Sequence, residues 1–221
     1  MVTSSFNIGS LISFEGIEGC GKSTQIVLLA ERLRDAGKEV VVSREPGATP
    51  LGSKLRKLLL DPAYSPDALT ELLLYLADRR EHRRLVIAPA LQRGALVLVD
   101  RYVDSTWVYQ GFARDGVESS LIEKLNHLVV GDNWPELTFV LDCPAPVGLT
   151  RARERNREIG AEGVADRFEQ RHLDFHERVR QGFLVLAEAA KERFRVIDAD
   201  QEIEMIHNHI WQEFSLKYAI S

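Results

Sequence analysis

The stretch Gly16-Ile17-Glu18-Gly19-Cys20-Gly21-Lys22-Ser23 fits the pattern G-x-x-x-x-G-K-[ST] at every fixed position. It follows a short apolar run and precedes residues with helical spacing, which is the context in which this pattern forms a phosphate-binding loop, or P-loop. The glycines let backbone N–H groups turn inward around phosphate oxygens, and the start of the following helix adds partial positive charge. We expect Lys22 to reach the β- and γ-phosphates and Ser23 to hold Mg²⁺. The residues predicted to bind ATP are Gly16, Ile17, Glu18, Gly19, Cys20, Gly21, Lys22, Ser23 and Thr24.

Five short, nearly continuous apolar runs are typical of buried parallel strands. They lie at 11–15, 39–43, 95–99, 137–141 and 194–197. The stretches between them have the apolar spacing of helices, and no internal repeat or long linker interrupts the alternation. The pattern predicts an α/β fold of the P-loop type. Five parallel strands would form a doubly wound sheet flanked by helices, with the active groups at the carboxyl ends of the strands.

The length of 221 residues suits one domain of this kind. We expect residues 1–10 to form a flexible N-terminal extension and residues 11–221 to form a single domain. Residues 151–166 carry arginines at 151, 153, 155 and 157 and glycines at 160 and 163. Glycine and charge in one segment indicate a mobile lid, at about 150–166, over a site. The alternative is a solvated helix end, on which Arg151 and Arg155 share a face.

The composition excludes several classes of protein. Lys and Arg total 28 against 33 Asp and Glu, giving a formal net charge of −5, whereas a general nucleic-acid-binding protein usually has a basic excess. The only two cysteines, Cys20 and Cys143, make neither a disulfide framework nor a metal cluster, and they favour a reducing compartment. The first residues lack a signal-peptide pattern, and no apolar run is long enough to cross a bilayer. We therefore expect a cytoplasmic protein that binds neither nucleic acid nor membrane.

Asp100 and Arg101 come directly after the third apolar run, at the edge of the sheet where the P-loop lies. An acid at this place can bind the Mg²⁺ shell, and the arginine beside it can bind a second phosphate. The alternative is a simple ion pair at the end of a strand. Arg44 follows the second run, and Arg56 lies on the next helix, so both could grip a phosphate through paired hydrogen bonds. The pattern predicts a phosphorylated acceptor opposite the triphosphate.

A helix predicted from about Pro66 has two faces. The core side is expected to carry Leu69, Leu72, Leu73 and Leu76. Tyr75 and Arg79 lie one turn apart on another side, where a ring and a guanidinium could stack on a base and bond its edge. A surface contact between the two side chains is equally compatible with this spacing. Tyr109 and Gln110 are expected near the same crevice, in contact with a sugar or a base.

These blocks together resemble the thymidylate kinase family, over essentially the whole of residues 11–221. The matching stretches are residues 14–25, REPG at 44–47, LLYLADR at 73–79, DRYVDS at 100–105, YQG at 109–111 and DRFE at 166–169. The resemblance implies transfer of the γ-phosphoryl group of ATP to dTMP, giving dTDP, with Mg²⁺ as cofactor. It also implies a homodimer and a lid.

The resemblance assigns roles to the residues at the matching positions. Tyr75 would stack on thymine, Arg79 and Gln110 would bond the base, and Tyr109 would crowd the 2′ position of the sugar. Three arginines would surround the acceptor phosphate: Arg44, Arg56 and Arg101. The full set predicted to bind the acceptor is Glu15, Arg44, Glu45, Arg56, Tyr75, Arg79, Arg101, Tyr109 and Gln110.

The P-loop here contains Glu18 and Cys20 but no arginine, so the chain resembles the bacterial type, in which the catalytic arginine lies in the lid. Arg153 or a neighbour would then be that arginine. The predicted catalytic residues are Lys22, Arg101 and Arg153. The predicted metal ligands are Ser23 and Asp100.

Two other functions stay open from the residues alone. A deoxynucleoside kinase would need a carboxylate base near the 5′-hydroxyl of its acceptor, and Glu45 could supply it. A nucleotide-binding regulator without turnover would need only the P-loop. The arginines of the lid and Arg101 argue against such a regulator, because they add charge where only a transferring phosphoryl group requires it.

Overall fold

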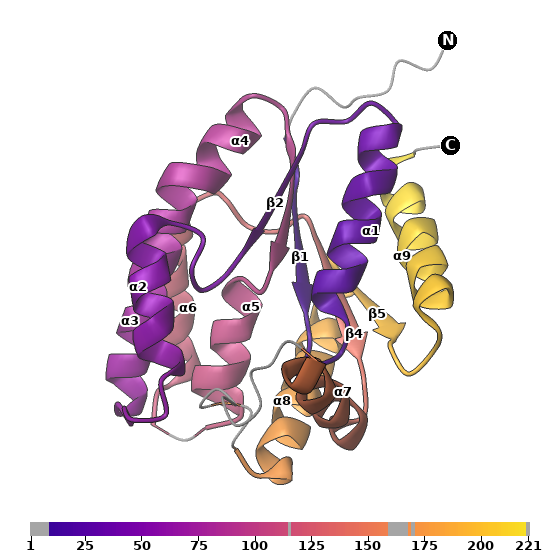
Figure 1. Ribbon diagram of the computed structural model, residues 1–221. Coiled ribbons are helices and arrows are strands. Elements are labelled where there is room, and N and C mark those ends of the chain that lie inside the picture. The colour runs from indigo at the N-terminus through magenta and orange to yellow at the C-terminus, as the bar shows by residue number, and fades with distance from the viewer. Residues whose placement is uncertain (1–8, 115, 159–167, 169–170, 220–221) are drawn as a thin grey trace.

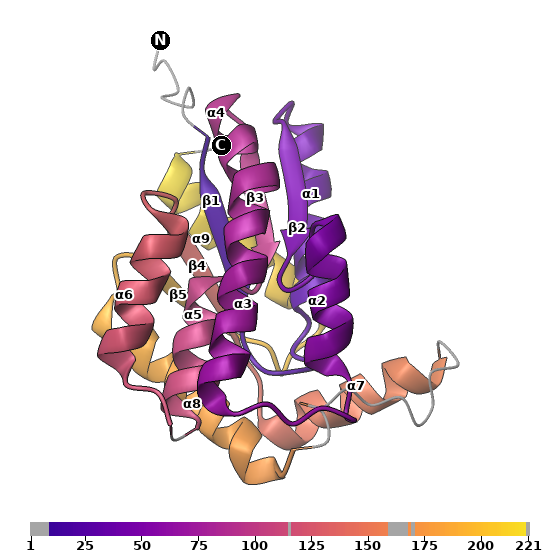
Figure 2. The same ribbon diagram turned by 90° about the vertical axis from the view of Figure 1, so that its left-hand side faces the viewer.

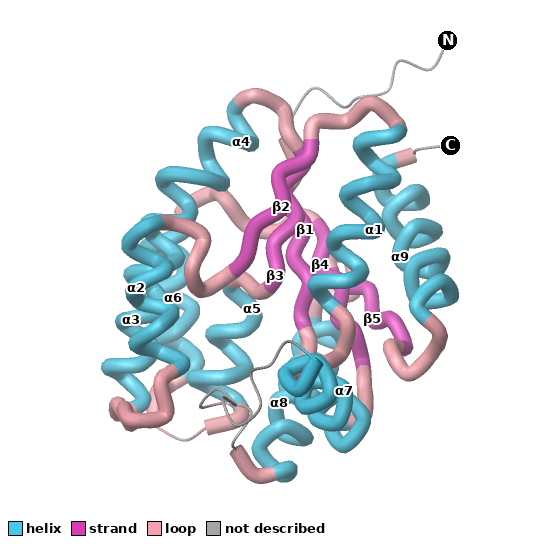
Figure 3. Tube along the Cα trace, viewed as in Figure 1, coloured by secondary structure: helices cyan, strands magenta, loops and turns pink. Residues whose placement is uncertain are grey.

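Five parallel strands form the centre of the fold in the computed structural model, which describes residues 9–114, 116–158, 168 and 171–219. The strands are β1 (Leu11–Glu15), β2 (Val40–Arg44), β3 (Leu96–Asp100), β4 (Leu137–Asp142) and β5 (Phe194–Asp198). Their order is β2-β3-β1-β4-β5, and every neighbouring pair is parallel. The prediction of a five-stranded parallel sheet is therefore confirmed, and Figure 3 shows the sheet enclosed by helices.

Helices cover both faces of the sheet (Figure 1). One face carries α1 (Lys22–Asp35) and α9 (Ile203–Tyr218), which pack against each other. The other face carries α3 (Ala68–His82), α5 (Val103–Thr106), α6 (Ser119–Val130) and α8 (Leu173–Ala189). The remaining helical segments are α2 (Pro50–Leu60), α4 (Ala88–Gln92), α7 (Ala145–Glu158) and the π-helical segments Arg83–Ile87 and Trp107–Phe112. This arrangement confirms the predicted doubly wound architecture.

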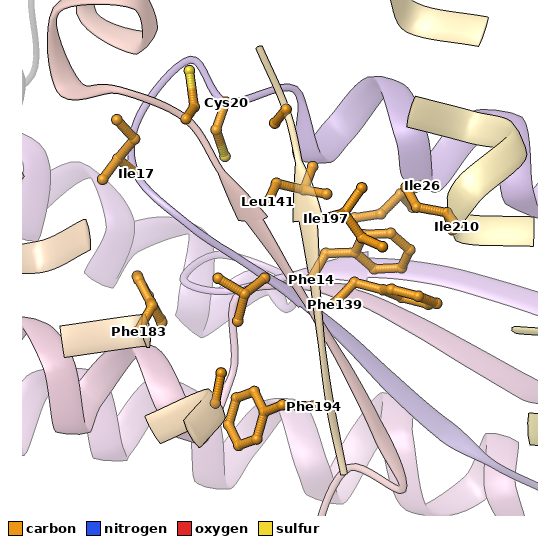
Figure 4. Close-up of a cluster of buried hydrophobic side chains, with 14 of the residues drawn as sticks. Phe14, Ile17, Cys20, Ile26, Phe139, Leu141, Phe183, Phe194, Ile197 and Ile210 are labelled. Carbon is orange, nitrogen blue, oxygen red and sulfur yellow. The ribbon is translucent and has the colours of Figure 1, made fainter. Parts of the chain in front are cut away.

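A layer of apolar side chains holds α1 on the sheet. Phe14 of β1 and Phe139 of β4 have ring centroids 5.2 Å apart, and Figure 4 shows Ile26 of α1 and Ile210 of α9 against them. All four side chains are buried. Burying one such side chain contributes about 1.5–3 kcal/mol. The layer therefore fixes the start of α1, and with it the preceding loop, at the carboxyl edge of the sheet.

Helix α3 begins where its sequence allows a cap. The carboxylate of Asp67 accepts hydrogen bonds from the backbone N–H groups of Leu69 and Thr70, which have no partner inside the helix. Leu72 and Leu76 are buried as predicted. Leu69 and Leu73 are 45% and 51% exposed, so the prediction that they face the core is wrong. The apolar stripe of α3 is wider than the surface that packs against it.

The predicted terminal extension and lid are described only in part. Residues 1–8 lie outside the described residues, whereas Gly9 and Ser10 are buried, and the Ser10 carbonyl accepts a hydrogen bond from Val97 N at 2.8 Å. Of the predicted lid, residues 150–158 form the last part of α7, and 159–166 lie outside the described residues. Across the residues that are described, no helix is both long enough and apolar enough to cross a membrane.

Candidate active site

The loop between β1 and α1 has the geometry of an anion cradle. Gly19 and Gly21 have φ values of 71° and 97°, a backbone conformation that other residues rarely adopt. The Lys22 ammonium donates to the carbonyls of Gly16 at 3.2 Å and Ile17 at 2.7 Å. The first turn of α1 contains no acidic residue, and no side chain caps it. The partial positive charge at this helix end is therefore left for a bound anion.

The two predicted metal ligands lie together. The Ser23 hydroxyl donates to Asp100 Oδ2 at 2.7 Å across 77 positions of sequence. Asp100 ends β3, and Arg44, at the end of β2, is its register partner. Mg²⁺ takes oxygen ligands and is usually held by one or two protein groups together with substrate phosphates. One hydroxyl and one carboxylate at the mouth of the P-loop fit this ion.

The carboxylate of Glu18 ties the P-loop to the neighbouring elements. Its Oε1 accepts hydrogen bonds from Arg101 Nη2 at 2.9 Å and from the Tyr109 hydroxyl at 2.8 Å. Its Oε2 lies 3.2 Å from Nδ1 of the fully buried His176 on α8. Burial raises the pKa of Glu18, but the charge of Arg101 and the hydrogen bond with His176 outweigh it, so the pKa lies below its usual range. Glu18 is therefore an anion that orients Arg101 and Tyr109.

Glu15 holds the turn that follows β3 through hydrogen bonds with Tyr102 and Ser105. Arg101 has a φ of 67°, unusual for a residue with a side chain. Glu15 Oε1 accepts from Tyr102 N at 2.8 Å, and Oε2 accepts from the Ser105 hydroxyl at 2.6 Å. Burial and the neighbouring Asp104 raise the pKa of Glu15 to about 7. Both Glu15 oxygens are used by protein donors, so the geometry favours a supporting role over the predicted contact with substrate.

Glu45 and Arg79 form a buried pair. Arg79 Nε donates to Glu45 Oε2 at 2.8 Å, and Glu45 Oε1 lies 2.8 Å from His82 Nδ1. Arg79 also donates to Thr106 Oγ1, Asn126 Oδ1 and the Tyr102 carbonyl. At 1% exposure, Arg79 uses four of its five N–H groups inside the protein. In this arrangement Arg79 has at most one N–H group left for the predicted contact with the edge of a base.

The residues predicted around a base and sugar form an aromatic wall. Tyr75 lies 6.5 Å from the ring of Phe168, and Tyr109 meets the same ring edge-on at 5.6 Å. Arg101 lies over the Tyr109 ring at 4.8 Å. Gln110 is buried, and its side-chain amide donates to Glu71 Oε1 at 2.8 Å. Tyr75 and Tyr109 are thus brought together, whereas the Gln110 amide is turned toward Glu71.

The remaining predicted arginines lie along the same carboxyl edge. Arg44 is exposed at the end of β2, and Arg56 of α2 donates to the Pro46 carbonyl at 2.9 Å, in the loop that follows β2. Arg153 is exposed on α7. Gly148 and Ala152 of α7 face the P-loop. Arg155 continues that stripe at the spacing i, i+4, i+7, whereas Arg153 lies on another side of the helix.

Comparisons with known proteins identify the family. The family model described as thymidylate kinase matches residues 14–210. The chain belongs to the thymidylate kinase family. A relative from Geobacter sulfurreducens, named thymidylate kinase, is 52% identical over 200 residues, which are 89% of this chain and 92% of the relative. Another, from Halothermothrix orenii, is 45% identical over 205 residues, covering 93% and 96% of the two chains.

A solved structure supports the same assignment. The crystal structure of thymidylate kinase from Ehrlichia chaffeensis matches with a TM-score of 0.74 and 35% identity, covering 94% of this chain and 98% of that one. As a member of the family, the chain is a phosphotransferase that uses ATP to convert dTMP to dTDP. A deoxynucleoside kinase or a regulator without turnover is no longer needed to explain the P-loop. Glu45, the base that a nucleoside kinase would require, has both oxygens paired with Arg79 and His82.

Sequence reasoning missed two residues that support the site. His176 contacts Glu18 from 158 positions away, and Asn126 accepts a hydrogen bond from Arg79 across 47 positions. Neither lies in a motif. A buried histidine or asparagine on an otherwise apolar helix face is the only local signal, and it does not name the partner.

Proposed function

We propose that the P-loop at 16–24 holds ATP and that Arg101 holds the phosphate of dTMP directly beside it. One observation carries this assignment. Lys22 Nζ and Arg101 Nη1 both donate to the Gly16 carbonyl, at 3.2 Å and 2.9 Å. Two phosphate groups bound by these cations would be neighbours, which is the arrangement that phosphoryl transfer requires.

The transfer needs positioning and charge neutralisation more than acid–base chemistry. An oxygen of the acceptor phosphate attacks the γ-phosphorus, and the bond from that phosphorus to the β–γ bridging oxygen breaks. The attacking oxygen is already ionised, so no strong general base is required. Lys22 would stabilise charge on the transferring group and on the leaving ADP. When bound at Ser23 and Asp100, Mg²⁺ would neutralise further charge on the phosphate oxygens.

A lid arginine would complete the set of cations. Arg153 or a neighbour was expected from the sequence, and the stripe formed by Gly148, Ala152 and Arg155 favours Arg155. A guanidinium on this stripe extends from the side of α7 that contacts the P-loop. An arginine placed in this way typically accelerates transfer by about 10³-fold or more.

The acceptor pocket would recognise dTMP through its aromatic wall. We assign Tyr75 to stacking on thymine, because its ring lies in the same cluster as Phe168 and Tyr109. Tyr109 is held by Glu18 and lies against Arg101, so it is placed beside the sugar of a phosphate bound to Arg101. Arg44 and Arg56 would bind the acceptor phosphate from the β2 side. Arg79, Gln110, Glu15 and Glu45 would shape the pocket.

A coupled ADP-release assay tests this function. Wild-type protein with ATP and Mg²⁺ is given dTMP, dUMP, UMP, CMP, AMP, GMP or thymidine, each in turn. We expect dTMP to be the preferred acceptor, and EDTA or Asp100→Asn to remove most of the rate. Equal use of thymidine and dTMP, or full activity in EDTA, would contradict the assignment.

We propose that the protein is a cytoplasmic homodimer. Exposed leucines lie on two helices that pack side by side: Leu69 and Leu73 on α3, and Leu121 and Leu128 on α6. Exposed apolar side chains gathered on packed helices are typical of an interface. Light scattering should give twice the mass of 25.0 kDa for wild type, and a smaller mass for Leu73→Asp. The exposed Leu216→Asp on α9 serves as the control.

A further inference from the structure

The start of helix α7 packs against the outer side of the P-loop. In Figure 1, α7 passes directly beneath the loop that joins β1 to α1, and Figure 2 shows its C-terminal part projecting outward from the same place. The contact is formed by Gly19 of the loop and Gly148 of the helix, and neither position has room for a side chain. The P-loop is therefore supported from behind by α7.

A side chain at either glycine would clash with the segment that carries the other. A Cβ atom added to Gly148 would lie 2.5 Å from the Glu18 carbonyl oxygen and 2.8 Å from Ile17 Cδ1. A Cβ added to Gly19 would overlap the Gly148 carbonyl oxygen and lie 3.0 Å from Ala152 N. These neighbours are mainly backbone atoms, which cannot move aside as the end of a flexible side chain can. Any residue larger than glycine at 148 must displace the loop or the helix.

We propose that Gly148 is a positioning residue for ATP: its contact with Gly19 holds the P-loop amides in their phosphate-binding arrangement and ties α7 to that loop. The argument rests on the proposed function, because it takes the P-loop as the ATP site. The glycines of the loop allow its amides to turn toward a phosphate, and on its other side the loop lies against the backbone of α7. Because α7 also carries Arg155, the same contact fixes the start of the helix from which the lid arginine extends.

The first test is Gly148→Ala, with ATP affinity measured by calorimetry in the absence of dTMP. We expect the affinity to fall by about tenfold or more, the loss that follows when one charge-assisted hydrogen bond is disrupted. Gly182→Ala is the matched control. Gly182 is also a helical glycine with a tight added Cβ, 2.9 Å from Phe112 Cδ1 and 3.0 Å from Val108 Cγ1, but these neighbours are side-chain atoms of the segment Trp107–Phe112 and not backbone atoms of the P-loop. Its ATP affinity should equal that of wild type.

Thermal unfolding of both variants separates positioning from general destabilisation. If Gly148→Ala lowers the unfolding temperature but leaves ATP affinity unchanged, or if Gly182→Ala loses as much ATP affinity, the proposal is overturned. Failure of the wild type to bind ATP would instead defeat the proposed function. The wild-type arm therefore distinguishes the two failures.

A second measurement needs no variant and applies even if Gly148→Ala does not fold. Amide hydrogen exchange of the wild type is followed with and without ATP. We expect ATP to slow exchange at residues 148–152 of α7 together with the P-loop, while α4, which packs against β3 and the segment Arg83–Ile87, is unchanged, because stabilising one side of a tight contact stabilises the other. Slowing confined to the P-loop and α1 would overturn the proposal.

Discussion

Replacing Glu45 by glutamine separates a structural role for this carboxylate from contact with substrate. Glu45 lies 2.8 Å from both Arg79 Nε and His82 Nδ1, and the three side chains are 2%, 1% and 0% exposed. Removing one partner of a buried pair costs about 3–5 kcal/mol, because the other charge is left uncompensated. Arg79 keeps its hydrogen bonds to Thr106, Asn126 and the Tyr102 carbonyl, so we expect the lower end, about 3 kcal/mol.

Urea unfolding at neutral pH measures this loss, with Glu81→Gln as control. The partner of Glu81 is the exposed Arg84, so the urea midpoint of this control should equal that of the wild type. Burial and the charge of Glu45 raise the pKa of Asp78 to about 6. In Glu45→Gln that pKa should fall, as followed by NMR of the side-chain carboxyl. A Glu45→Gln protein as stable as wild type, but with a raised KM for dTMP, would refute the structural role.

Three further predictions concern the catalytic cations and the turn at Arg101. Lys22→Ala should nearly abolish turnover in steady-state kinetics, and a near-normal kcat would remove Lys22 from the site. Arg155→Ala should lower kcat by about 10³-fold with little change in the KM for dTMP, whereas Arg153→Ala should lose much less; the reverse ranking would identify Arg153. The pKa of Glu15 is raised from 4.5 to about 7, so its contribution to stability is present below pH 4.5 and is lost as the pH rises through about 7. Urea midpoints at pH 5 and pH 8 should therefore differ less in Glu15→Gln than in wild type, and equal differences would contradict the assignment.

The sequence predicts those parts of the site that lie in one segment of the chain or at the carboxyl ends of the strands. The P-loop contains its own turns and its own cation, so the pattern at 16–23 is sufficient to place it after a strand and before a helix. The carboxyl ends of β2 and β3 bring Arg44 beside Asp100 because parallel strands align their ends. The Ser23–Asp100 contact follows from the same topology. The parallel direction of the strands is predicted from the sequence, whereas their order comes from the structure.

The parts that sequence could not predict depend on which side of an element is covered. Leu69 and Leu72 have the same chemistry, yet one is exposed and the other buried, because α6 packs against only part of the stripe on α3. Arg79 and Arg153 are both arginines on helices, yet Arg79 is enclosed and Arg153 is exposed. Periodicity gives the angle between two side chains on a helix but not the neighbour that each one meets. For the same reason, the sequence did not indicate that His176 contacts Glu18.

The burial of the carboxylates changes how the arginines of this site should be understood. Glu18 holds Arg101, and Glu45 holds Arg79. An arginine side chain has many rotamers, and fixing it when substrate arrives costs conformational entropy. A carboxylate that fixes the guanidinium beforehand removes that cost from the binding step, and it also keeps the cation from repelling Lys22 before a phosphate arrives. The acids near the acceptor pocket therefore act on the substrate through the arginines that they orient.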